Sequence, residues 1–294
     1  MRTAFLLLSA LFTSTLANYD PALGLRSVYY SGTSYCAKAS LDAWSCGEPC
    51  EWLGALDGFT RIENELLDTF CFVGFNAKEN EVVLSFRGTN GGNFKNWLTN
   101  LVYYRVQYDS VPDTQVHSGF YSAYSSISYY VIKALTDQLA KHPGARLLVT
   151  GHSMGGALAL FAALDIVKKL KPSNMELYTF GSPRVGNQAF TDFAMRTLPR
   201  TYQRVTHYTD MIVQVPTRGM GFNHAGNEVW YYNNAADGIY KVCENNPGAP
   251  ESPNCADSYY LTTGIDAHLN YLGKPISNMC PGDKAPAEGQ NIES

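Results

Sequence analysis

The sequence has no cluster of basic residues. Its 294 residues contain 22 lysines and arginines against 26 aspartates and glutamates, a formal net charge of −4. Because nucleic-acid binding requires a concentrated positive surface, this composition argues against a nucleic-acid partner. After the first residues no segment is long and apolar enough to cross a bilayer, so we expect no transmembrane segment. Internal repeats, interior linkers and Asn-x-Ser/Thr sequons are also missing, which predicts one domain without N-linked glycans.

The two ends of the chain differ from the rest of it. Residues 1–17 combine a positive Arg2, an apolar run from Phe5 to Phe12 and small residues up to Ala17, which is the pattern of a secretory signal peptide. Residues 281–294 are polar and lack a hydrophobic period, and we expect them to be disordered. The sequence thus predicts a secreted, extracellular protein whose folded domain comprises residues 18–280.

Seven cysteines occur in the chain, and in an exported protein disulfides are the default expectation. Cys71 lies in an apolar run typical of a core strand, and we interpret it as the one buried, unpaired thiol. Two pairs of the other six enclose short loops, so that local pairing is geometrically reasonable, and the remaining two would join the ends of the domain. These pairs are Cys46 with Cys50, Cys243 with Cys255, and Cys36 with Cys280. The sequence alone leaves this connectivity open.

Predicted strands and helices alternate along the domain. Strands are expected at residues 81–86, 147–150, 177–180, 205–208 and 229–232, and helices at residues 119–141 and 154–169. Such alternation is typical of a mostly parallel sheet that helices cover on both faces. The chain is therefore predicted to belong to the α/β class.

A G-x-S-x-G pattern follows the strand predicted at 147–150. Ser153 lies between Gly151 and Gly155, and the helix predicted at 154–169 begins directly after it. This strand–turn–helix context is that of the nucleophile elbow in α/β-hydrolases. The turn tolerates only small neighbours, and the helix N-terminus favours developing negative charge. Ser153 is therefore the candidate nucleophile, whereas the adjacent His152 is interpreted as a packing residue.

An unactivated serine needs an imidazole base that a carboxylate orients. In this fold the acid follows the serine along the chain, and the histidine follows the acid. Asp210 is the best acid, because it comes at the end of a β-branched strand, where catalytic loops of parallel sheets lie. Both His224 and His268 follow Asp210. Chain order favours His268, which comes after a long loop, and leaves His224 as the alternative.

Two backbone N–H groups are candidate donors to an oxyanion. Met154 begins the helix after the nucleophile, and Thr89 lies in the loop after the strand at 81–86. Both positions are those from which this fold takes its oxyanion donors.

A short amphipathic helix is predicted directly after Thr89. Phe94, Trp97, Leu98 and Leu101 occur at i, i+3, i+4 and i+7, which is one helix face, and a Gly-Gly pair precedes them. Because of its position, we expect this helix to act as a lid that covers the site in water and opens at a lipid–water interface. An ordinary surface helix packed on the core is the alternative.

The chain resembles the filamentous-fungal triacylglycerol lipases of class 3. The matching segments are LSFRGT (84–89), NWLTNL (96–101), HSGF (117–120), TGHSMGGALA (150–159), FGSPRVGN (180–187), VTHYTD (205–210) and AHL (267–269). They occur in order over nearly the whole predicted domain. One departure is Met154, which stands where the family commonly has leucine.

The resemblance implies an α/β-hydrolase fold with a central, mostly parallel sheet, flanking helices and a short helical lid at about residues 91–98. It implies Ser153, Asp210 and His268 as the catalytic triad, with the N–H groups of Thr89 and Met154 as the oxyanion hole. It also implies the three disulfides Cys36–Cys280, Cys46–Cys50 and Cys243–Cys255.

The function implied is that of a secreted triacylglycerol lipase. Ser153 would attack an acylglycerol ester, His268 would take its proton, and Asp210 would stabilise the imidazolium. No metal or other cofactor is expected, and we expect a monomer that acts at a lipid–water interface.

Two other functions compete with this prediction. The first is a feruloyl or other carboxylic esterase on the same fold, for which Tyr103, Tyr104 and Tyr108 are candidate residues of an aromatic pocket. The second is a catalytically inactive binding protein, which an intact set of serine, aspartate and histidine argues against.

Overall fold

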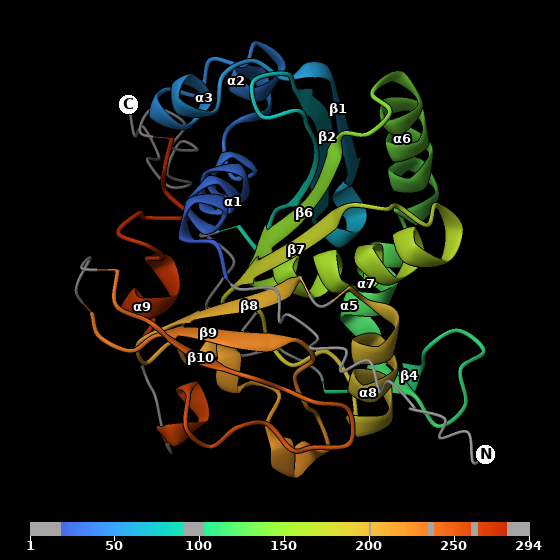
Figure 1. Cartoon of the computed structure of the whole chain (residues 1–294), viewed down its shortest axis with the longest axis vertical. Helices are drawn as coiled ribbons and strands as arrows, with labels where there is room; N and C mark the ends of the chain where they lie inside the picture. Colours follow the sequence, from blue (N-terminus) through green and yellow to red (C-terminus); the bar gives the residue numbers. More distant parts are fainter. Residues whose placement is uncertain (1–18, 91–102, 200, 235–237, 260–263, 281–294) are drawn as a thin grey trace, which may run out of the picture.

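The computed structural model describes residues 19–90, 103–199, 201–234, 238–259 and 264–280. An eight-stranded sheet lies at its centre, in the order β1-β2-β3-β6-β7-β8-β9-β10 (Figure 1). Strands β3, β6, β7, β8 and β9 run parallel to one another, while β1 and β2 at one end and β10 at the other pair antiparallel. The mostly parallel sheet predicted from the sequence is therefore confirmed.

The strands of this sheet are β1 (Asp57–Asn64), β2 (Thr69–Asn76), β3 (Glu81–Phe86), β6 (Arg146–His152), β7 (Met175–Phe180), β8 (Tyr202–His207), β9 (Asn227–Tyr231) and β10 (Lys241–Cys243). A separate hairpin consists of β4 (Arg105–Gln107) and β5 (Gln115–His117). The helices are α1 (Pro21–Thr33), α2 (Lys38–Asp42), α3 (Glu48–Leu53), α5 (Ser118–Ser125), α6 (Ser128–Lys141), α7 (Met154–Lys169), α8 (Gln188–Thr197) and α9 (Asp266–Leu269). Short 3-10 turns are η1 (Glu65–Leu67), η2 (Ile212–Gln214), η3 (Arg218–Met220) and η4 (Ala256–Ser258).

The predicted single helix over residues 119–141 is wrong. The structure has two helices there, α5 and α6, which are separated at Ser126 and Ile127. The Ser126 hydroxyl donates to the Ala123 carbonyl oxygen and the Ser128 hydroxyl to that of Ser125. Serine side chains compete in this way with the helical backbone pattern. Strand β3 and helix α7, by contrast, have the predicted bounds.

Alternate side chains of the central strands belong to two hydrophobic cores, one on each face of the sheet. In β3, Val82 and Leu84 belong to the core that α5, α6 and α7 cover, whereas Val83 belongs to the core under α1. Figure 1 shows α1 on one side of the sheet and α5 to α7 on the other. Because side chains of a strand point alternately to its two faces, a continuous apolar run such as β2 or β3 indicates a strand buried on both sides.

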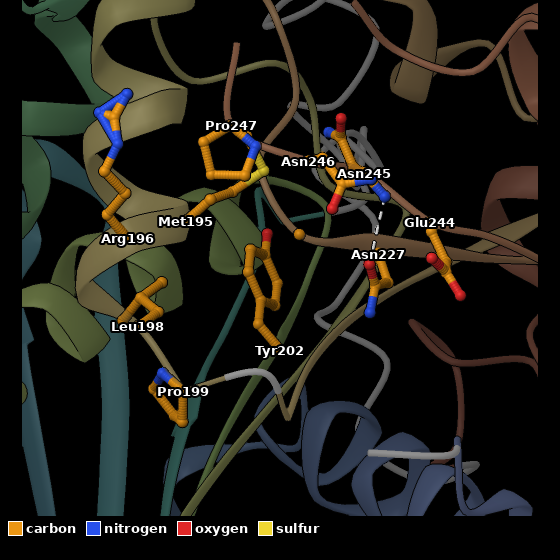
Figure 2. A pocket seen from close by; sticks show the side chains of 11 residues that line it. Met195, Arg196, Leu198, Pro199, Tyr202, Asn227, Glu244, Asn245, Asn246 and Pro247 are labelled. Atoms are coloured by element: carbon orange, nitrogen blue, oxygen red, sulfur yellow. Dashed lines mark hydrogen bonds between the residues drawn. The ribbon is translucent and has the colours of Figure 1, made fainter. Parts of the chain in front are cut away.

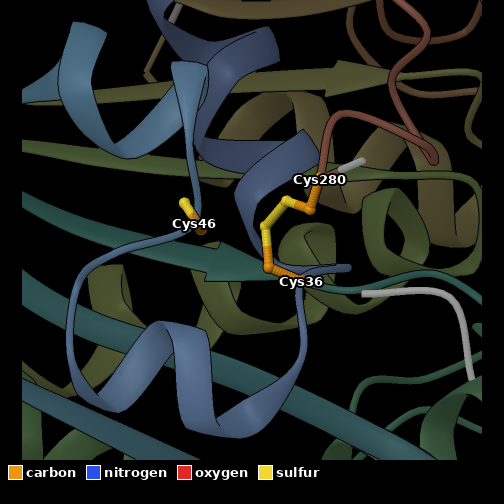
Figure 3. A group of neighbouring side chains, drawn as sticks. All are labelled: Cys36, Cys46 and Cys280. Carbon is orange, nitrogen blue, oxygen red and sulfur yellow. A yellow bond between two sulfur atoms is a disulfide. The ribbon is translucent and has the colours of Figure 1, made fainter. Parts of the chain in front are cut away.

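The three disulfides that the resemblance implied are present: Cys36–Cys280, Cys46–Cys50 and Cys243–Cys255. Cys71 is unpaired and fully buried in β2, as predicted. The first bond connects the end of α1 with the last residues described, and the Cys46 sulfur lies close to it (Figure 3). Within the residues described, no helix has the length and apolar character needed to cross a bilayer.

Replacing both Cys36 and Cys280 by alanine should cost more stability than replacing both Cys46 and Cys50. The first bond joins residues 244 positions apart and the second joins residues 4 apart. Loop-closure entropy alone gives about 5.5 kcal/mol for the longer loop and about 2 kcal/mol for the shorter one. Urea titration of the two double variants measures both losses. Equal losses would show that the entropy of the unfolded chain does not explain the stabilisation.

Candidate active site

The turn at Ser153 joins the end of β6 to the start of α7. Its backbone adopts φ 57° and ψ −130°, a strained region for a residue with a side chain. A Cβ atom at Gly151 would lie 2.3 Å from the Gly155 carbonyl oxygen, and one at Gly155 would lie 2.4 Å from the Phe86 carbonyl oxygen. Only glycine fits at either position, which is the physical reason for the G-x-S-x-G pattern.

Ser153 lies at the N-terminus of the 16-residue helix α7 and is 1% exposed. Its N–H donates to the Phe180 carbonyl oxygen at the end of β7, at 2.9 Å. Its hydroxyl oxygen is buried and has no hydrogen-bond partner among the residues that the structure describes. A buried serine hydroxyl at a helix N-terminus, uncommitted to a structural bond, has the arrangement expected of a nucleophile.

Asp210 and His268 form a buried pair beside this turn. The His268 Nδ1–H donates to Asp210 at 2.9 Å from Oδ2 and 3.1 Å from Oδ1. Asp210 follows β8 and His268 lies in α9. A Cβ atom at Gly181, which has φ 56°, would lie 2.8 Å from both Asp210 Oδ2 and His268 Nδ1. Since Gly181 directly follows Phe180, the pair lies against the strand end that accepts the Ser153 N–H.

Two further donors fix the Asp210 carboxylate. The Tyr271 hydroxyl donates to Oδ2 at 2.5 Å, and the Ile212 N–H donates to Oδ1 at 2.8 Å. Burial alone would raise the pKa of Asp210, but His268, Tyr271 and the Ile212 N–H together hold the pKa below its ordinary value. The carboxylate is therefore ionised and oriented. Sequence reasoning missed Tyr271, although it lies only three residues after His268.

His152 connects the loop after β3, at residues 87–89, with His268. The Gly88 N–H donates to the Tyr35 hydroxyl oxygen at 3.1 Å, and the Tyr35 hydroxyl is 2.8 Å from His152 Nδ1. His152 Nε2 is 2.8 Å from the His268 carbonyl oxygen. Since that carbonyl can only accept, Nε2 carries the proton and Nδ1 accepts from Tyr35. Burial lowers the pKa of His152 well below its ordinary value, so the ring stays neutral. It positions His268 as well as packing, a contact that the sequence did not reveal.

The structure brings the side chains of the two predicted oxyanion residues, Thr89 and Met154, close to each other. The Thr89 hydroxyl is 3.9 Å from the Met154 sulfur, and both residues are buried. A Cβ atom at Gly88 would lie 2.9 Å from that of Ser153, so the loop before Thr89 packs directly on Ser153. The predicted lid residues Phe94, Trp97, Leu98 and Leu101 lie outside the described residues.

His224, the alternative base, belongs to a different cluster. Its N–H donates to Glu251 at 2.7 Å, and its Nε2 is 2.9 Å from the Val213 carbonyl oxygen. Burial, together with the nearby positive Arg204, lowers its pKa well below the ordinary value. The structure thus brings His268 rather than His224 to Asp210.

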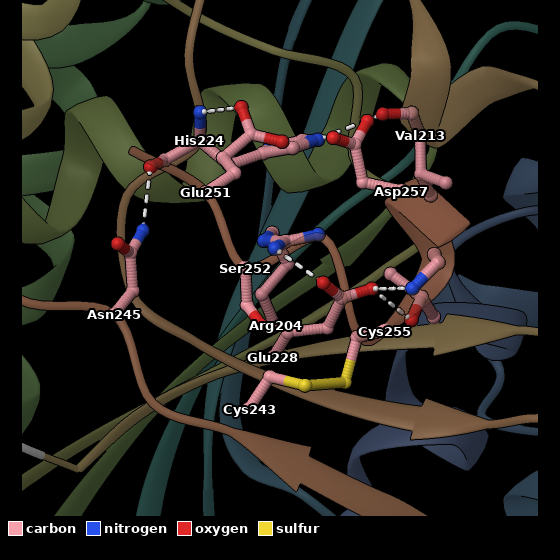
Figure 4. A network of polar contacts seen from close by, with 12 residues as sticks. Arg204, Val213, His224, Glu228, Cys243, Asn245, Glu251, Ser252, Cys255 and Asp257 are labelled. Atoms are coloured by element: carbon pink, nitrogen blue, oxygen red, sulfur yellow. Dashed lines mark hydrogen bonds and ion pairs between the residues drawn. A yellow bond between two sulfur atoms is a disulfide. The ribbon is translucent and has the colours of Figure 1, made fainter. Parts of the chain in front are cut away.

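A buried ionic network holds the segment that follows Asp210 (Figure 4). Arg184 is 2% exposed and makes two bonds to Glu251, of 2.8 and 2.9 Å, while its Nη1 donates to the Gln214 carbonyl oxygen at 2.7 Å. Arg204 pairs with Glu228 at 3.1 Å. Arg204 thus joins β8 to β9, and Arg184 joins Glu251 to Gln214, which lies four residues after Asp210.

Other features of the structure lie apart from this site. A cavity of about 330 Å³ lies at the amino end of β8, beside Tyr202, Asn227 and Asn245 (Figure 2), whereas Asp210 follows the opposite end of that strand. Among the described residues, the group of cysteine, histidine and acidic side chains compact enough for a metal ion is Cys36, Cys46 and Cys280. All three sulfurs are in disulfides and are therefore not thiolate ligands.

Comparison with known proteins shows a consistent similarity. The family model for class 3 lipases matches residues 83–220. A lipase from Rhizomucor miehei is 33% identical over 248 residues, which is 83% of this chain and 66% of the relative. A secreted mono- and diacylglycerol lipase from Fusarium solani is 35% identical over 173 residues, which is 59% of this chain and 50% of the relative. This chain therefore spans just under two thirds of the Rhizomucor relative and half of the Fusarium one.

The similarity extends to a solved structure. The Rhizomucor miehei triacylglyceride lipase superposes with a TM-score of 0.78 at 31% identity, over 86% of this chain and 94% of that one. The α/β-hydrolase fold expected from the sequence is thereby confirmed.

Glu251→Gln should destabilise the fold by about 3–5 kcal/mol at pH 7, because it removes the carboxylate that accepts two hydrogen bonds from the buried Arg184 guanidinium and leaves Asp257, at 3.2 Å, as the acidic partner. Burial would raise the pKa of Glu251, but His224, Arg184 and Arg204 lower it from 4.5 to about 2. The carboxylate therefore stabilises the fold fully above pH 4.5 and loses this effect as the pH falls towards 2. Unfolding free energies at several pH values measure the parent–variant difference, which should be constant above pH 4.5 and shrink below it.

The exposed ion pair between Lys133 and Asp137 provides the control. Asp137→Asn should leave stability nearly unchanged, because an exposed pair contributes little. If the difference in unfolding free energy between the parent and Glu251→Gln grew on acidification, the ionised Glu251 carboxylate would not be the stabilising group.

Proposed function

Because this chain belongs to the class 3 lipase family, we propose that it hydrolyses the carboxylic esters of acylglycerols with Ser153 as the nucleophile. The observation that carries the proposal is the buried Asp210–His268 pair on Gly181, next to the strained turn that holds Ser153. This arrangement matches the serine–histidine–aspartate pattern of acyl transfer.

The reaction proceeds through an acyl-enzyme. The Ser153 oxygen attacks the ester carbonyl while His268 takes the hydroxyl proton, and Asp210 stabilises the imidazolium. The N–H groups of Thr89 and Met154 bind the oxyanion. The imidazolium then protonates the leaving alcohol, and a water molecule that His268 deprotonates releases the fatty acid and restores Ser153. The protein alone supplies these groups, so the proposal includes no cofactor.

The proposed substrate is an acylglycerol at a lipid–water interface rather than a feruloyl ester. Of the tyrosines considered for an aromatic pocket, Tyr108 is 7% exposed and packs in the core, with its ring centroid 5.1 Å from that of Phe190 and 5.8 Å from that of Phe161. It is therefore committed to packing, which weakens the feruloyl alternative.

We propose further that the protein is exported and acts as a monomer. The supports for export are the signal-peptide pattern of residues 1–17, three disulfides and the Fusarium relative that is named as secreted.

His268→Ala should lower kcat/KM for a soluble short-chain ester by about 10⁴-fold, because the proposed base is lost. His224→Gln should lower the thermal midpoint by removing a buried hydrogen bond, and its kcat/KM should stay within about tenfold of the parent at a temperature where it is folded. Initial rates and thermal unfolding of both variants distinguish the two histidines. A folded His268→Ala variant with near-parental turnover would reject the triad.

The rate against one short-chain ester, measured from below to above its solubility limit, tests the interface. We expect a rise on crossing the limit, together with little turnover of a feruloyl ester, because a lid should open at the droplet surface. Smooth saturation with good feruloyl turnover would instead indicate an open-site esterase. In that outcome the lid assignment is wrong while the triad stands.

A further inference from the structure

The turn between β1 and β2 exposes two leucines. Leu66 is 96% exposed and Leu67 is 45% exposed, on the single turn η1. Isolated exposed leucines are common, but two adjacent ones at the tip of a hairpin form an apolar projection that needs a reason. We call residues 65–68 the dileucine turn.

The dileucine turn lies at the catalytic edge of the sheet. β1 ends and β2 begins where β3 ends, since Cys71 of β2 pairs with Phe86 of β3. The Arg87 N–H, just after β3, donates to the Phe70 carbonyl oxygen at 3.0 Å. β3 is parallel to β6, and Phe86 pairs with Gly151 just before the elbow. The leucines therefore project from the edge of the sheet at which the proposed nucleophile lies.

Local bonds fix the shape of the dileucine turn. The Leu67 N–H donates to Asn64 Oδ1 at 3.3 Å, and the Asp68 N–H donates to the Glu65 carbonyl oxygen at 3.3 Å. Asp68 adopts a left-handed φ of 46°. Arg87 holds Asp68 from the side through its carboxylate and its carbonyl oxygen. Because the backbone is constrained, the leucines cannot fold back onto the protein without breaking these bonds.

Each carboxylate beside the leucines has a cationic partner. Lys38 pairs with Glu63 at 2.6 Å and with Glu65 at 2.9 Å, and Arg87 pairs with Asp68. A turn that enters a lipid surface must not bring an unpaired charge with it, because burying one is costly. Because these carboxylates are paired, the two leucines are the part of the turn that would enter a lipid surface first.

We propose that Leu66 and Leu67 form an interfacial anchor that inserts into the surface of an acylglycerol droplet. The inference rests on the proposed function, which places the substrate in that surface. A second copy of the chain is a poorer occupant, because two side chains offer far less than the roughly 1,200 Å² that a stable protein interface buries. The anchor precedes the oxyanion loop in the chain, whereas the predicted lid follows it, so the two would contact the surface from different elements.

Arg87 links the anchor to the active site. Its side chain holds Asp68 of the dileucine turn, and the next residue is Gly88, which packs on Ser153. Insertion of the leucines therefore brings the oxyanion loop to the lipid surface in a fixed orientation. The anchor acts in adsorption, and the chemical step does not require it.

The test compares the variant Leu66→Ser/Leu67→Ser with Val242→Ser. Val242 is 45% exposed, as Leu67 is, but lies on β10 at the far end of the sheet. Binding to trioctanoin droplets is measured in a Ser153→Ala background, so that the droplets are not consumed. The leucine variant should bind about a hundredfold more weakly, since each of the two leucines that move from water to lipid contributes about tenfold. Val242→Ser should bind like its parent.

Turnover of a soluble monomeric ester, measured with Ser153 present, separates this proposal from the proposed function. The leucine variant should retain parental kcat/KM there and lose rate only on droplets. Equal droplet binding by the leucine variant and its parent, or no droplet binding by the parent, would overturn the anchor. Failure of the parent on the soluble ester would instead overturn the proposed function.

Discussion

The left-handed backbone at Ser153 is the constraint on which the arrangement of the proposed active site depends. α7 can start directly behind the serine only because Gly155 lets it approach the Phe86 carbonyl oxygen and Gly151 lets it approach β6. The same turn directs the Ser153 N–H to Phe180, and the next residue, Gly181, accommodates the Asp210–His268 pair. The ends of three parallel strands, β3, β6 and β7, thus contact this turn, and the burial of α7 against one face of the sheet offsets the strain there.

Hydrogen bonds between side chains and backbone atoms join the parts of the proposed site into one unit. Gly88, Tyr35, His152 and His268 are connected in series, and the chain ends on the carbonyl oxygen of His268 rather than on its ring. The ring itself is held by Asp210, which Tyr271 and Ile212 hold in turn. His268 lies on a helix of four residues, too short to be rigid by itself. Its orientation therefore comes from contacts at both its main chain and its side chain.

The sequence predicts those parts of the fold that local signals determine. β3 and α7 have the predicted bounds because an apolar run and an Ala- and Leu-rich segment indicate their secondary structure without reference to the rest of the chain. The prediction of one helix over residues 119–141 was wrong because the side chains of Ser126 and Ser128 donate hydrogen bonds to nearby backbone carbonyl oxygens. Chain order predicted Asp210 and His268 together, and the structure pairs them. The sequence did not reveal that Tyr35 contacts His152 or that Glu251 pairs with Arg184. Tyr35 lies 117 residues from His152 and Glu251 lies 67 from Arg184, and no periodicity connects residues so far apart.

The unpaired thiol of Cys71 sits in the middle of β2, with β1 and β3 on either side, and burial raises its pKa. Thiol–disulfide exchange requires an accessible thiolate. In the unfolded chain seven cysteine sulfurs compete to form three disulfides, which use only six of them. Pairing of β2 with β1 and β3 buries Cys71, which leaves the six cysteines of the three disulfides to react. The sheet therefore reduces incorrect disulfide pairing during oxidative folding, since it encloses Cys71, the cysteine that has no native disulfide partner.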